Sequence, residues 1–348
     1  MKCRLLFHRA PQSFILASEE VLTRRVGEGL SPISARINVF DPPAVLIGFG
    51  QDVFEEVNVE EAKRLGFEIG RRPTGGGAIV MDGEATPGWE IWLPKDFPGL
   101  PSDVEGLYRH LSRVIVETLR LLGVEARYRP KNDVEVGGRK VCGMGLLTLG
   151  SGLMICGTIL LDLDVEKMLR VLRIPVEKLS DKAVKEVGKR IVTLRELLGK
   201  PPSIEEVKQA FSEALRRVLG LEVFEGELSE AELKEVRALE RRYGDPSWVF
   251  EFRRCTGFEK VCTYKTPGGL VRIHAKVSGG RLEQIMITGD FFAYPQRAVL
   301  DLEAWLKHVP IDAVEEEVER FFEESKAVIH GLSPRDLAQL IRKCLEGL

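Results

Sequence analysis

The sequence predicts an α+β protein of two domains. Its 348 residues are enough for two hydrophobic cores, and 44% hydrophobic with 30% charged residues is the balance of a globular protein. Many short strand-like segments joined by tight turns, with few helices between them, favour α+β over a regularly alternating α/β sheet. We place the first domain at residues 1–225, with a helical connector at its end, and a smaller α+β domain at 226–348.

The first domain is expected to contain one long amphipathic helix packed on strands. Residues 104–122 place one apolar stripe at helical spacing, formed by Val104, Leu107, Leu111, Val114, Ile115, Leu119 and Leu122. Strands are expected at 33–40, 44–49, 77–81, 90–93, 133–136, 139–149 and 153–163. The segment Gly150–Gly152 between the last two is expected to form a hairpin turn.

The second domain follows a charged helical stretch. Pro201-Pro202 ends the preceding element, and Ser203 is expected to cap a helical region over residues 203–242. After it, strands are expected at 249–255, 259–264, 269–277 and 281–288, and helices near 295–306, 311–325 and 334–347. This order predicts a small antiparallel sheet covered by helices.

Charge and hydropathy limit the partners and the location. The net charge of −3 gives no reason to expect nucleic acid, and no apolar run approaches the ~20 residues that span a bilayer, so no membrane partner is expected. The opening residues lack the apolar stretch of a signal peptide, which predicts a cytoplasmic protein. Three asparagines and six glutamines among abundant charged residues predict a thermophilic source.

The six cysteines contain no CxxC pair, so a zinc ribbon is not expected. Buried free thiols are the favoured interpretation. In a thermophile, Cys255 and Cys262 on two neighbouring expected strands are an alternative disulfide pair.

A glycine loop is the first candidate functional segment. Arg71 and Arg72 precede three consecutive glycines, which expose backbone N–H groups and leave room for a ligand, in the sequence RRPTGGGAIV (71–80). A flexible loop with solvated arginines is the alternative. Because paired arginines stand on one side and an apolar strand on the other, we favour a cradle for carboxylate or phosphate.

A β-hairpin carries the second candidate group. Asn132 and Asp133 stand at its entry, Gly137-Gly138 forms its turn, and Lys140 lies on the returning strand. Two hard oxygen ligands and a lysine at one end of a sheet suit magnesium and phosphate. Taken alone, Lys140 is better explained as a surface lysine of an exposed hairpin.

The motifs together resemble the lipoate–protein ligase family, with a fused C-terminal accessory domain. The resemblance runs through Pro43–Gln51 with Glu56-Val57-Asn58, RRPTGGGA (71–78), KND (131–133) with GRKVCG (138–143), GTILLDLD (157–164), residues 179–197 and LEQIMITGDFFAYP (282–295). It implies the biotin/lipoate protein ligase fold, in which a mixed antiparallel sheet forms the catalytic domain. It also implies an ATP-dependent ligase that makes lipoyl-AMP, with ATP and magnesium as cofactors and lipoate as substrate. The implied partners are the lipoyl domains of 2-oxoacid dehydrogenase acyltransferases or the glycine cleavage H protein.

The resemblance also implies roles for individual residues. Lys140 would be catalytic, contacting the lipoyl carbonyl and the phosphate. Contacts with ATP and the adenylate are implied for Arg72, Gly77, Ala78, Ile79, Val80 and Lys140. Contacts with lipoate are implied for Arg71, Gly75, Gly76 and Lys140, and a metal role for Asn132 and Asp133.

Some positions depart from the family pattern. Met81-Asp82 stands where His-Asp is usual, and Cys156-Gly157 stands where His-Gly is expected, which leaves the choice between lipoate and octanoate open. None of the five histidines lies in these motifs, so a histidine general base is not expected.

The main alternative is an octanoyl or lipoyl transferase that holds the acyl group as a cysteine thioester. Cys142 is the suspicious thiol because a nearby ammonium group such as that of Lys140 lowers a thiol pKa. Against it, we expect Cys142 to face away from Lys140, and in similar transferases the acylated cysteine precedes the hairpin, where this chain has PKND (130–133). A biotin–protein ligase does not match the glycine loop, and a non-enzymatic binder of carrier domains does not explain the retained Lys140.

Overall fold

The structure of the chain, a computed structural model, describes residues 1–173 and 181–346. These residues form two compact units, which are described separately. Unit 1 comprises Met1–Leu46, Val57–Gly70 and Ile79–Asp245, and unit 2 comprises Ile47–Glu56, Arg71–Ala78 and Pro246–Leu348. Two short segments of the N-terminal half therefore pack with the C-terminal part of the chain. The boundary near residue 225 stays a prediction.

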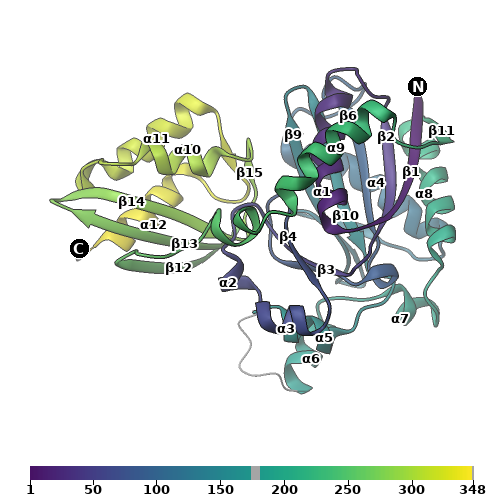
Figure 1. Cartoon of the computed structure of the whole chain (residues 1–348), viewed down its shortest axis with the longest axis horizontal. Helices are drawn as coiled ribbons and strands as arrows, with labels where there is room; N and C mark the ends of the chain where they lie inside the picture. Colours follow the sequence, from purple (N-terminus) through teal and green to yellow (C-terminus); the bar gives the residue numbers. More distant parts are fainter. Residues whose placement is uncertain (174–180, 347–348) are drawn as a thin grey trace. The chain divides into compact units, whose positions relative to one another are not determined.

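An eight-stranded mixed sheet is the centre of unit 1 (Figure 1). Its strand order is β11-β1-β2-β6-β10-β9-β8-β7. β1 pairs in parallel with β11 and β2, and the other neighbours are antiparallel. The strands are β1 (Lys2–Ala10), β2 (Ser34–Phe40), β6 (Gly88–Pro94), β7 (Arg127–Arg129), β8 (Asp133–Val136), β9 (Arg139–Leu149), β10 (Gly152–Ile159) and β11 (Glu222–Glu225).

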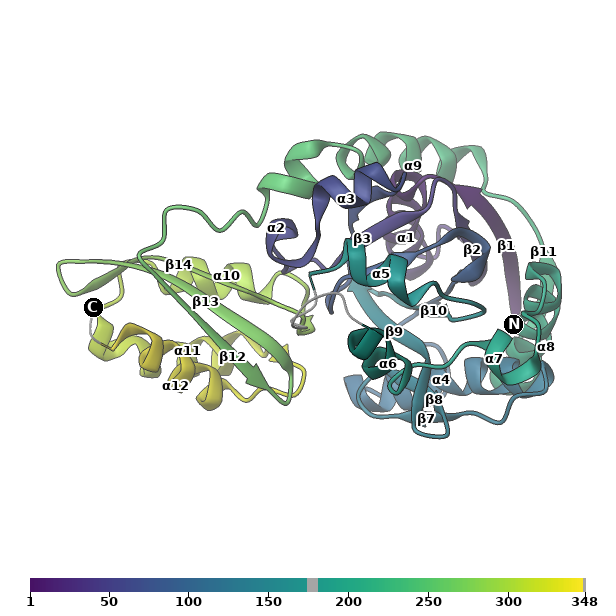
Figure 2. The same cartoon turned by 90° about the horizontal axis from the view of Figure 1, so that it is seen from below.

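Helices cover both faces of this sheet. α1 (Gln12–Gly27) and α9 (Glu230–Tyr243) pack on one face, and α4 (Val104–Leu121) and α8 (Ile204–Leu219) on the other, as Figure 2 shows from below. Two tryptophans of β6 show the alternation: Trp92 donates to the carbonyl of Glu19 in α1, whereas Trp89 packs against Phe211 in α8. Both faces of β6 are therefore buried.

Polar capping residues begin three of the helices, and Ser203 among them was predicted. Ser203 and Glu206 form a capping box at the start of α8, and Ser229 and Glu232 form another at α9. Asp103 caps α4 by accepting from the backbone of Gly106. Five of the seven residues of the predicted α4 stripe are buried, which confirms that face: Leu107, Leu111, Val114, Ile115 and Leu119.

Smaller elements complete unit 1. A three-stranded sheet has the order β4-β3-β5, formed by β4 (Glu68–Arg71), β3 (Ala44–Ile47) and β5 (Ile79–Met81), and the last residues of β4 and β3 are assigned to unit 2. The short helices are α3 (Val59–Arg64), η1 (Gly83–Ala85), α5 (Val165–Val171), α6 (Asp181–Gly188) and α7 (Leu194–Leu198). The family-like segment 179–197 begins two residues before α6, and those two residues lie outside the described ones.

Unit 2 is built on an antiparallel sheet with helices packed on it. The sheet has the order β12-β13-β14, formed by β12 (Lys260–Thr266), β13 (Gly269–Ser278) and β14 (Arg281–Gly289). α10 (Ala298–Trp305) packs on β14, and α12 (Pro334–Leu345) packs on β12, β13 and α11 (Val314–Ser325). The remaining elements are α2 (Val53–Glu56), η2 (Ser247–Glu251), β15 (Ala293–Tyr294), η3 (Ile311–Ala313) and β16 (Val328–Ile329).

The predicted strand at 249–255 is wrong. Residues 247–251 form a helical turn, η2, in which Trp248 and Val249 are buried. A short run rich in aromatic residues has no periodicity that separates a strand from a buried helical turn. In the part of the chain that the structure describes, no helix combines the length and the apolar character that crossing a bilayer requires.

The alternative disulfide pair is also wrong. Cys262 of β12 is bonded to Cys344 of α12, 82 residues away, and Cys255 is free. The pairing expected from two adjacent strands fails because Cys255 does not lie on a strand, whereas α12 packs directly on β12.

Candidate active site

The β8–β9 hairpin holds Lys140 in an ion pair. Its Nζ lies 2.7 Å from Oδ1 of Asp133, and Oδ2 of Asp133 accepts from Arg129 at 2.6 Å. The backbone of Lys140 is fixed from the other side, since its N–H donates to Arg190 and its carbonyl accepts from Val192. The ammonium group therefore has a defined position, and the lysine side chain is about one-third exposed.

A glycine leaves room for this ammonium group. A Cβ at Gly143 would lie 2.6 Å from Nζ of Lys140, so a side chain there would displace the amine. The lysine thus lies across the surface of its own strand rather than extending into solvent. Sequence reasoning missed Arg129, although its position opposite Asp133 across β7 and β8 follows from the register of the two strands.

Cys142 faces away from Lys140, as expected, because of an irregularity in the strand pairing. Residues two apart on a regular strand share a face, so plain alternation would put Lys140 and Cys142 on the same side. The pairing shifts between Val134 and Glu135: Val134 pairs with Cys142 and Glu135 with Lys140, which leaves Val141 as an extra residue. This bulge turns the thiol into the core. Cys142 is fully buried, and burial raises its pKa to about 12.

Asn132 and Asp133 do not offer a free magnesium site in this arrangement. Each carboxylate oxygen of Asp133 already contacts a cation, Lys140 or Arg129, and the side-chain amide of Asn132 donates to the carbonyl of Met144 at 2.6 Å. A magnesium ion at Asp133 would have to replace one of the two cations. The metal role of these residues stays a prediction.

The glycine loop, residues 71–78, belongs to unit 2. Arg72 closes the loop on itself: its guanidinium donates to the carbonyls of Gly75 at 2.8 Å and Gly77 at 2.7 Å, and to the hydroxyl of Thr74 at 3.1 Å. The carbonyl oxygens of this loop are therefore partly turned toward Arg72. The side chain of Arg72 therefore holds the loop in this shape.

Arg71 is fully buried among backbone carbonyls. It donates to Gln51 at 2.5 Å, Trp248 at 3.0 Å and Val249 at 2.9 Å, and burial, with Arg253 nearby, lowers its pKa to about 9. Its donors are engaged within unit 2, so this arginine fastens the loop to the segments at 47–56 and 246–252. Contact with lipoate stays a prediction for Arg71.

Close packing explains why positions 75 and 76 of the loop are glycines. The N–H of Gly76 donates to the carbonyl of Phe291 at 3.0 Å, and a Cβ on Gly76 would lie 2.6 Å from the ring of Phe292. A Cβ on Gly75 would lie 2.8 Å from the carbonyl oxygen of Phe291. The GDFF segment (289–292) and the glycine loop therefore approach at backbone distance within unit 2. Both segments had been singled out in the sequence, but nothing in it joined them.

The structure assigns the expected site residues to different units. Lys140, Asn132 and Asp133 lie in unit 1, whereas Arg71, Arg72 and residues 75–78 lie in unit 2. Ile79 and Val80 begin β5 in unit 1, where they pair with Leu46 and Val45 of β3. The loop is thus continuous with a strand of the other unit. The roles of all these residues in binding remain predictions.

A second acid–lysine pair lies at a position that departs from the family pattern. Asp82, which follows Met81, accepts from Nζ of Lys167 in α5 at 2.9 and 3.0 Å. The same ammonium lies 4.7 Å above the ring of Phe67. Sequence reasoning did not single out Lys167, because nothing local links α5 to β5.

Known families match both halves of the chain. Residues 11–216 match the lipoyl protein ligase A/B catalytic domain, and residues 256–341 match the C-terminus of bacterial lipoate protein ligase. Octanoyltransferase LipM of Kyrpidia tusciae is 31% identical, over 68% of this chain and 94% of that protein. Lipoate–protein ligase 1 of Staphylococcus aureus is 28% identical, over 75% of this chain and 76% of that protein.

Solved structures share the fold. The bipartite lipoate protein ligase of Thermoplasma acidophilum, described with its E2 lipoyl domain, is 26% identical with a TM-score of 0.65, over 73% of this chain and 98% of that one. LipL1 of P. falciparum in complex with lipoate has a TM-score of 0.75 at 16% identity, over 98% of both chains. These neighbours confirm the predicted fold class. The chain therefore belongs to the lipoate–protein ligase family, with a catalytic domain of the lipoyl protein ligase A/B type and a fused C-terminal lipoate protein ligase domain.

Proposed function

We propose that the chain is an ATP-dependent lipoate–protein ligase that forms lipoyl-AMP and transfers the lipoyl group to a lysine of a lipoyl carrier domain. The observation that carries this proposal is the lipoate-ligase C-terminal domain at residues 256–341. The octanoyltransferase of Kyrpidia tusciae is matched over 94% of its length by 68% of this chain. A large part of this chain therefore has no counterpart in that transferase.

The proposed chemistry gives the ammonium group of Lys140 a role. A lipoate carboxylate oxygen attacks the α-phosphorus of ATP, which forms the acyl–phosphate bond and releases pyrophosphate. The two reactants are both anions, so a fixed ammonium such as that of Lys140 lowers their repulsion in the transition state. The carrier lysine then attacks the acyl carbonyl, loses a proton and releases AMP. No covalent bond to the enzyme is needed.

The thiols of unit 1 support a mechanism without an acyl-enzyme. All six cysteines of the chain lie among the described residues, and three of them are in unit 1. Cys3 and Cys142 are buried, and burial raises the pKa of each to about 12, whereas a nucleophilic cysteine needs an accessible thiolate. Cys156 of β10 is half-buried, with its sulfur 3.6 Å from the carbonyl of Gly145.

A cysteine-dependent octanoyl or lipoyl transferase is the second candidate. The similarity to the octanoyltransferase of Kyrpidia tusciae, at 31% identity, favours it. In that function the acyl group would arrive from an acyl carrier protein as a thioester. It would pass through a cysteine thioester to the carrier lysine without ATP. Among the three thiols of unit 1, Cys142 and Cys156 lie on the paired strands β9 and β10 and are the ones to test for this candidate.

One experiment separates the two candidates. The purified full chain is incubated with an apo lipoyl domain and either ATP, magnesium and free lipoate, or an octanoyl acyl carrier protein without ATP. Intact-mass measurement of the lipoyl domain shows which donor is used. We expect modification in the first mixture, with pyrophosphate released in proportion. Modification in the second mixture alone would refute the ligase.

A cysteine variant tests the covalent step directly. Cys142→Ala removes a buried sulfur and should keep most of the ligase activity, since no acyl-enzyme is proposed. Cys156→Ala serves as the matched variant for the half-buried thiol. The ligase proposal fails if either folded variant loses all transfer, or if peptide mass spectrometry finds an acyl group on Cys142 or Cys156.

A further inference from the structure

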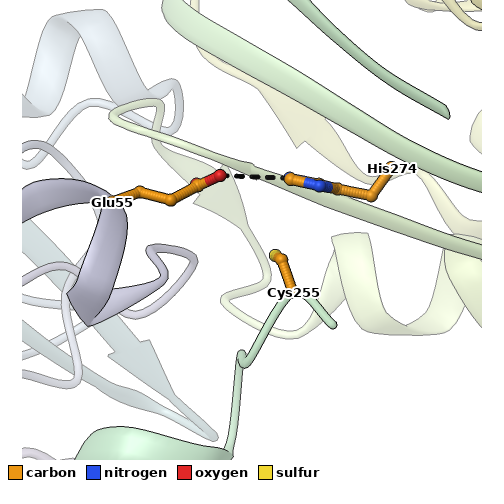
Figure 3. Close-up of side chains that lie close together, drawn as sticks. All are labelled: Glu55, Cys255 and His274. Carbon is orange, nitrogen blue, oxygen red and sulfur yellow. Dashed lines mark ion pairs between the residues drawn. The ribbon is translucent and has the colours of Figure 1, made fainter. Parts of the chain in front are cut away.

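Three potential metal ligands from distant parts of the sequence converge in unit 2. Glu55 comes from α2, Cys255 from the turn after η2, and His274 from the middle of β13. Each offers one ligand atom, and these atoms all lie within 4.8 Å of one another. Figure 3 shows the Glu55 carboxylate and the His274 ring pointing toward each other, with the sulfur of Cys255 turned toward the same space.

The donor types and their spacing suit a zinc-like ion. Thiolate, imidazole and carboxylate are the three side-chain ligands of zinc, with bonds of about 2.0–2.3 Å. In a tetrahedral site such ligand atoms lie about 3.3–3.8 Å apart. Oε1 of Glu55 is 3.7 Å from Nε2 of His274, which is within this range. Small movements of Cys255 would bring the remaining pairs into it.

Charges around the three ligands favour a cation. The carboxylate of Glu55 interacts electrostatically with the carboxylates of Asp52 and Glu56. Arg272 contacts both Glu55 and Glu56. Arg272 approaches Oε2 of Glu55 at 3.5 Å, on the oxygen that does not face His274. Arg253, also nearby, is paired with Glu303 at 2.6 Å. Arg272 thus serves two carboxylates, at 2.5 Å from Glu56 and 3.5 Å from Glu55, and Asp52 adds a third carboxylate to the group.

Neighbouring groups hold the ligands in place. Oδ2 of Asp52 accepts the backbone N–H of Cys255 at 2.8 Å, and its Oδ1 accepts that of Phe54 at 2.9 Å, so one carboxylate fixes both Cys255 and the start of α2. Contacts of this kind are the usual means of orienting metal ligands. The hydroxyl of Thr288 lies 3.0 Å from Nε2 of His274 and 3.3 Å from Glu55, and an ion bound at Nε2 would take the place of this hydroxyl.

The three ligand side chains are shielded from solvent. His274 is almost fully buried, and Glu55 and Cys255 are half-buried. The sulfur of Met286, 3.4 Å from that of Cys255, lies on the same side of the cluster.

We infer that Glu55, Cys255 and His274 bind one divalent transition-metal ion of the zinc class, with a structural role in unit 2. The ion would join the segment 47–56 to β13 and to the turn after η2. That segment also supports the glycine loop, since Phe49 donates to Thr74 and Arg72 donates to Ile47 through their backbones. The inference depends on contacts within unit 2 and does not rest on the proposed ligase activity.

Metal content and spectroscopy of the full chain test this site. The protein is stripped with a chelator and titrated with Zn(II), and separately with Co(II), whose bound thiolate gives a charge-transfer absorption in the near ultraviolet. We expect one equivalent of either ion and a thiolate band with Co(II). Cys255→Ser should abolish the band, and Glu55→Gln and His274→Gln should each weaken binding at least tenfold.

A matched cysteine variant completes the test. Cys156→Ser changes another half-buried thiol, in unit 1, and should bind the metal like the parent chain. Circular dichroism of each variant shows whether it is folded, and the Co(II) spectrum of Glu55→Gln reports on the site if Cys255→Ser fails to fold. Two outcomes would overturn the inference: no stoichiometric binding by the folded parent chain, or a thiolate band that survives in Cys255→Ser.

Discussion

Replacement of Lys140 by alanine should separate catalysis from stability. The variant loses one ammonium group at the position proposed to stabilise phosphate and carboxylate charge, and removal of a comparable donor costs ~10²–10³ in rate. Its stability should change little, because the ion pair with Asp133 is partly exposed and such pairs contribute about 0–1 kcal/mol. Asp133 also keeps its contact with Arg129. We therefore expect slow adenylation at a nearly unchanged melting temperature.

The neighbouring Arg139 supplies the matched control. Its side chain is exposed to a similar degree and forms its own ion pair, at 2.7 Å, with Glu196. Arg139→Ala removes a charge and a partly exposed ion pair from the same strand, but from a residue with no proposed contact to substrate. Lipoate-dependent pyrophosphate release is measured for both variants and for the parent chain. We expect the control to react at close to the parental rate.

The charge-conserving variant tests the geometry around Lys140. Lys140→Arg keeps the positive charge, but its planar guanidinium is broader than the amine that lies over Gly143. We expect this variant to be slow as well. The reasoning is refuted if Lys140→Ala lipoylates its carrier near the parental rate, or if Arg139→Ala loses as much activity as Lys140→Ala.

Two further predictions concern stability. Cys344→Ala opens a loop of 82 residues closed by the bond to Cys262, and the chain-entropy relation gives a loss of about 4–5 kcal/mol, measurable as a lower denaturation midpoint than that of the oxidised parent chain. Burial alone raises the pKa of Glu232, but hydrogen bonds from Arg4 and Ser31 outweigh burial and hold it at about 2. The contribution of ionised Glu232 to the free energy of unfolding is therefore complete above about pH 4.5 and declines as the pH falls toward 2. Glu232→Gln lacks this contribution, so its free energy of unfolding should fall less steeply with pH across that window.

Short-range patterns in the sequence were sufficient to predict the β8–β9 hairpin and the start of α8. The Gly-Gly turn at 137–138 has positive φ at both residues, as a tight hairpin turn requires, and the strands on either side begin and end where they were expected. Ser203 caps α8 as predicted. These features depend on residues a few positions apart, so the sequence carries them directly.

The first strand and helix could not be read from the sequence in the same way. β1 and α1 carry buried polar residues, including Arg4, Gln12 and Glu19, which interrupt the expected apolar pattern. Arg4 is buried because Glu232, 228 residues later, accepts from it at 2.6 and 2.8 Å. A pattern based on nearby residues has no access to such a partner. The bulge beside Lys140 is hidden for the same reason, because it appears only in the pairing of β8 with β9.

The glycine loop shows why the fused C-terminal domain bears on function. Its backbone is held by Phe291, its glycines leave room for Phe291 and Phe292, and Arg71 ties it to Trp248 and Val249. All these contacts lie within unit 2, so the loop shares a packing unit with residues 246–348 although it lies in the N-terminal half of the sequence. A chain without those residues would have to hold the loop by other means.

This packing bears on the proposed ligase function. Adenylation requires a preorganised anion-binding loop in addition to a fixed ammonium, because two anions must meet before the first bond forms. Transfer from an existing thioester avoids that step, so it places a smaller demand on such a loop. Under the proposed ligase function, the packing of Phe291 and Phe292 against RRPTGGGA would hold this loop in one shape before ATP and lipoate meet.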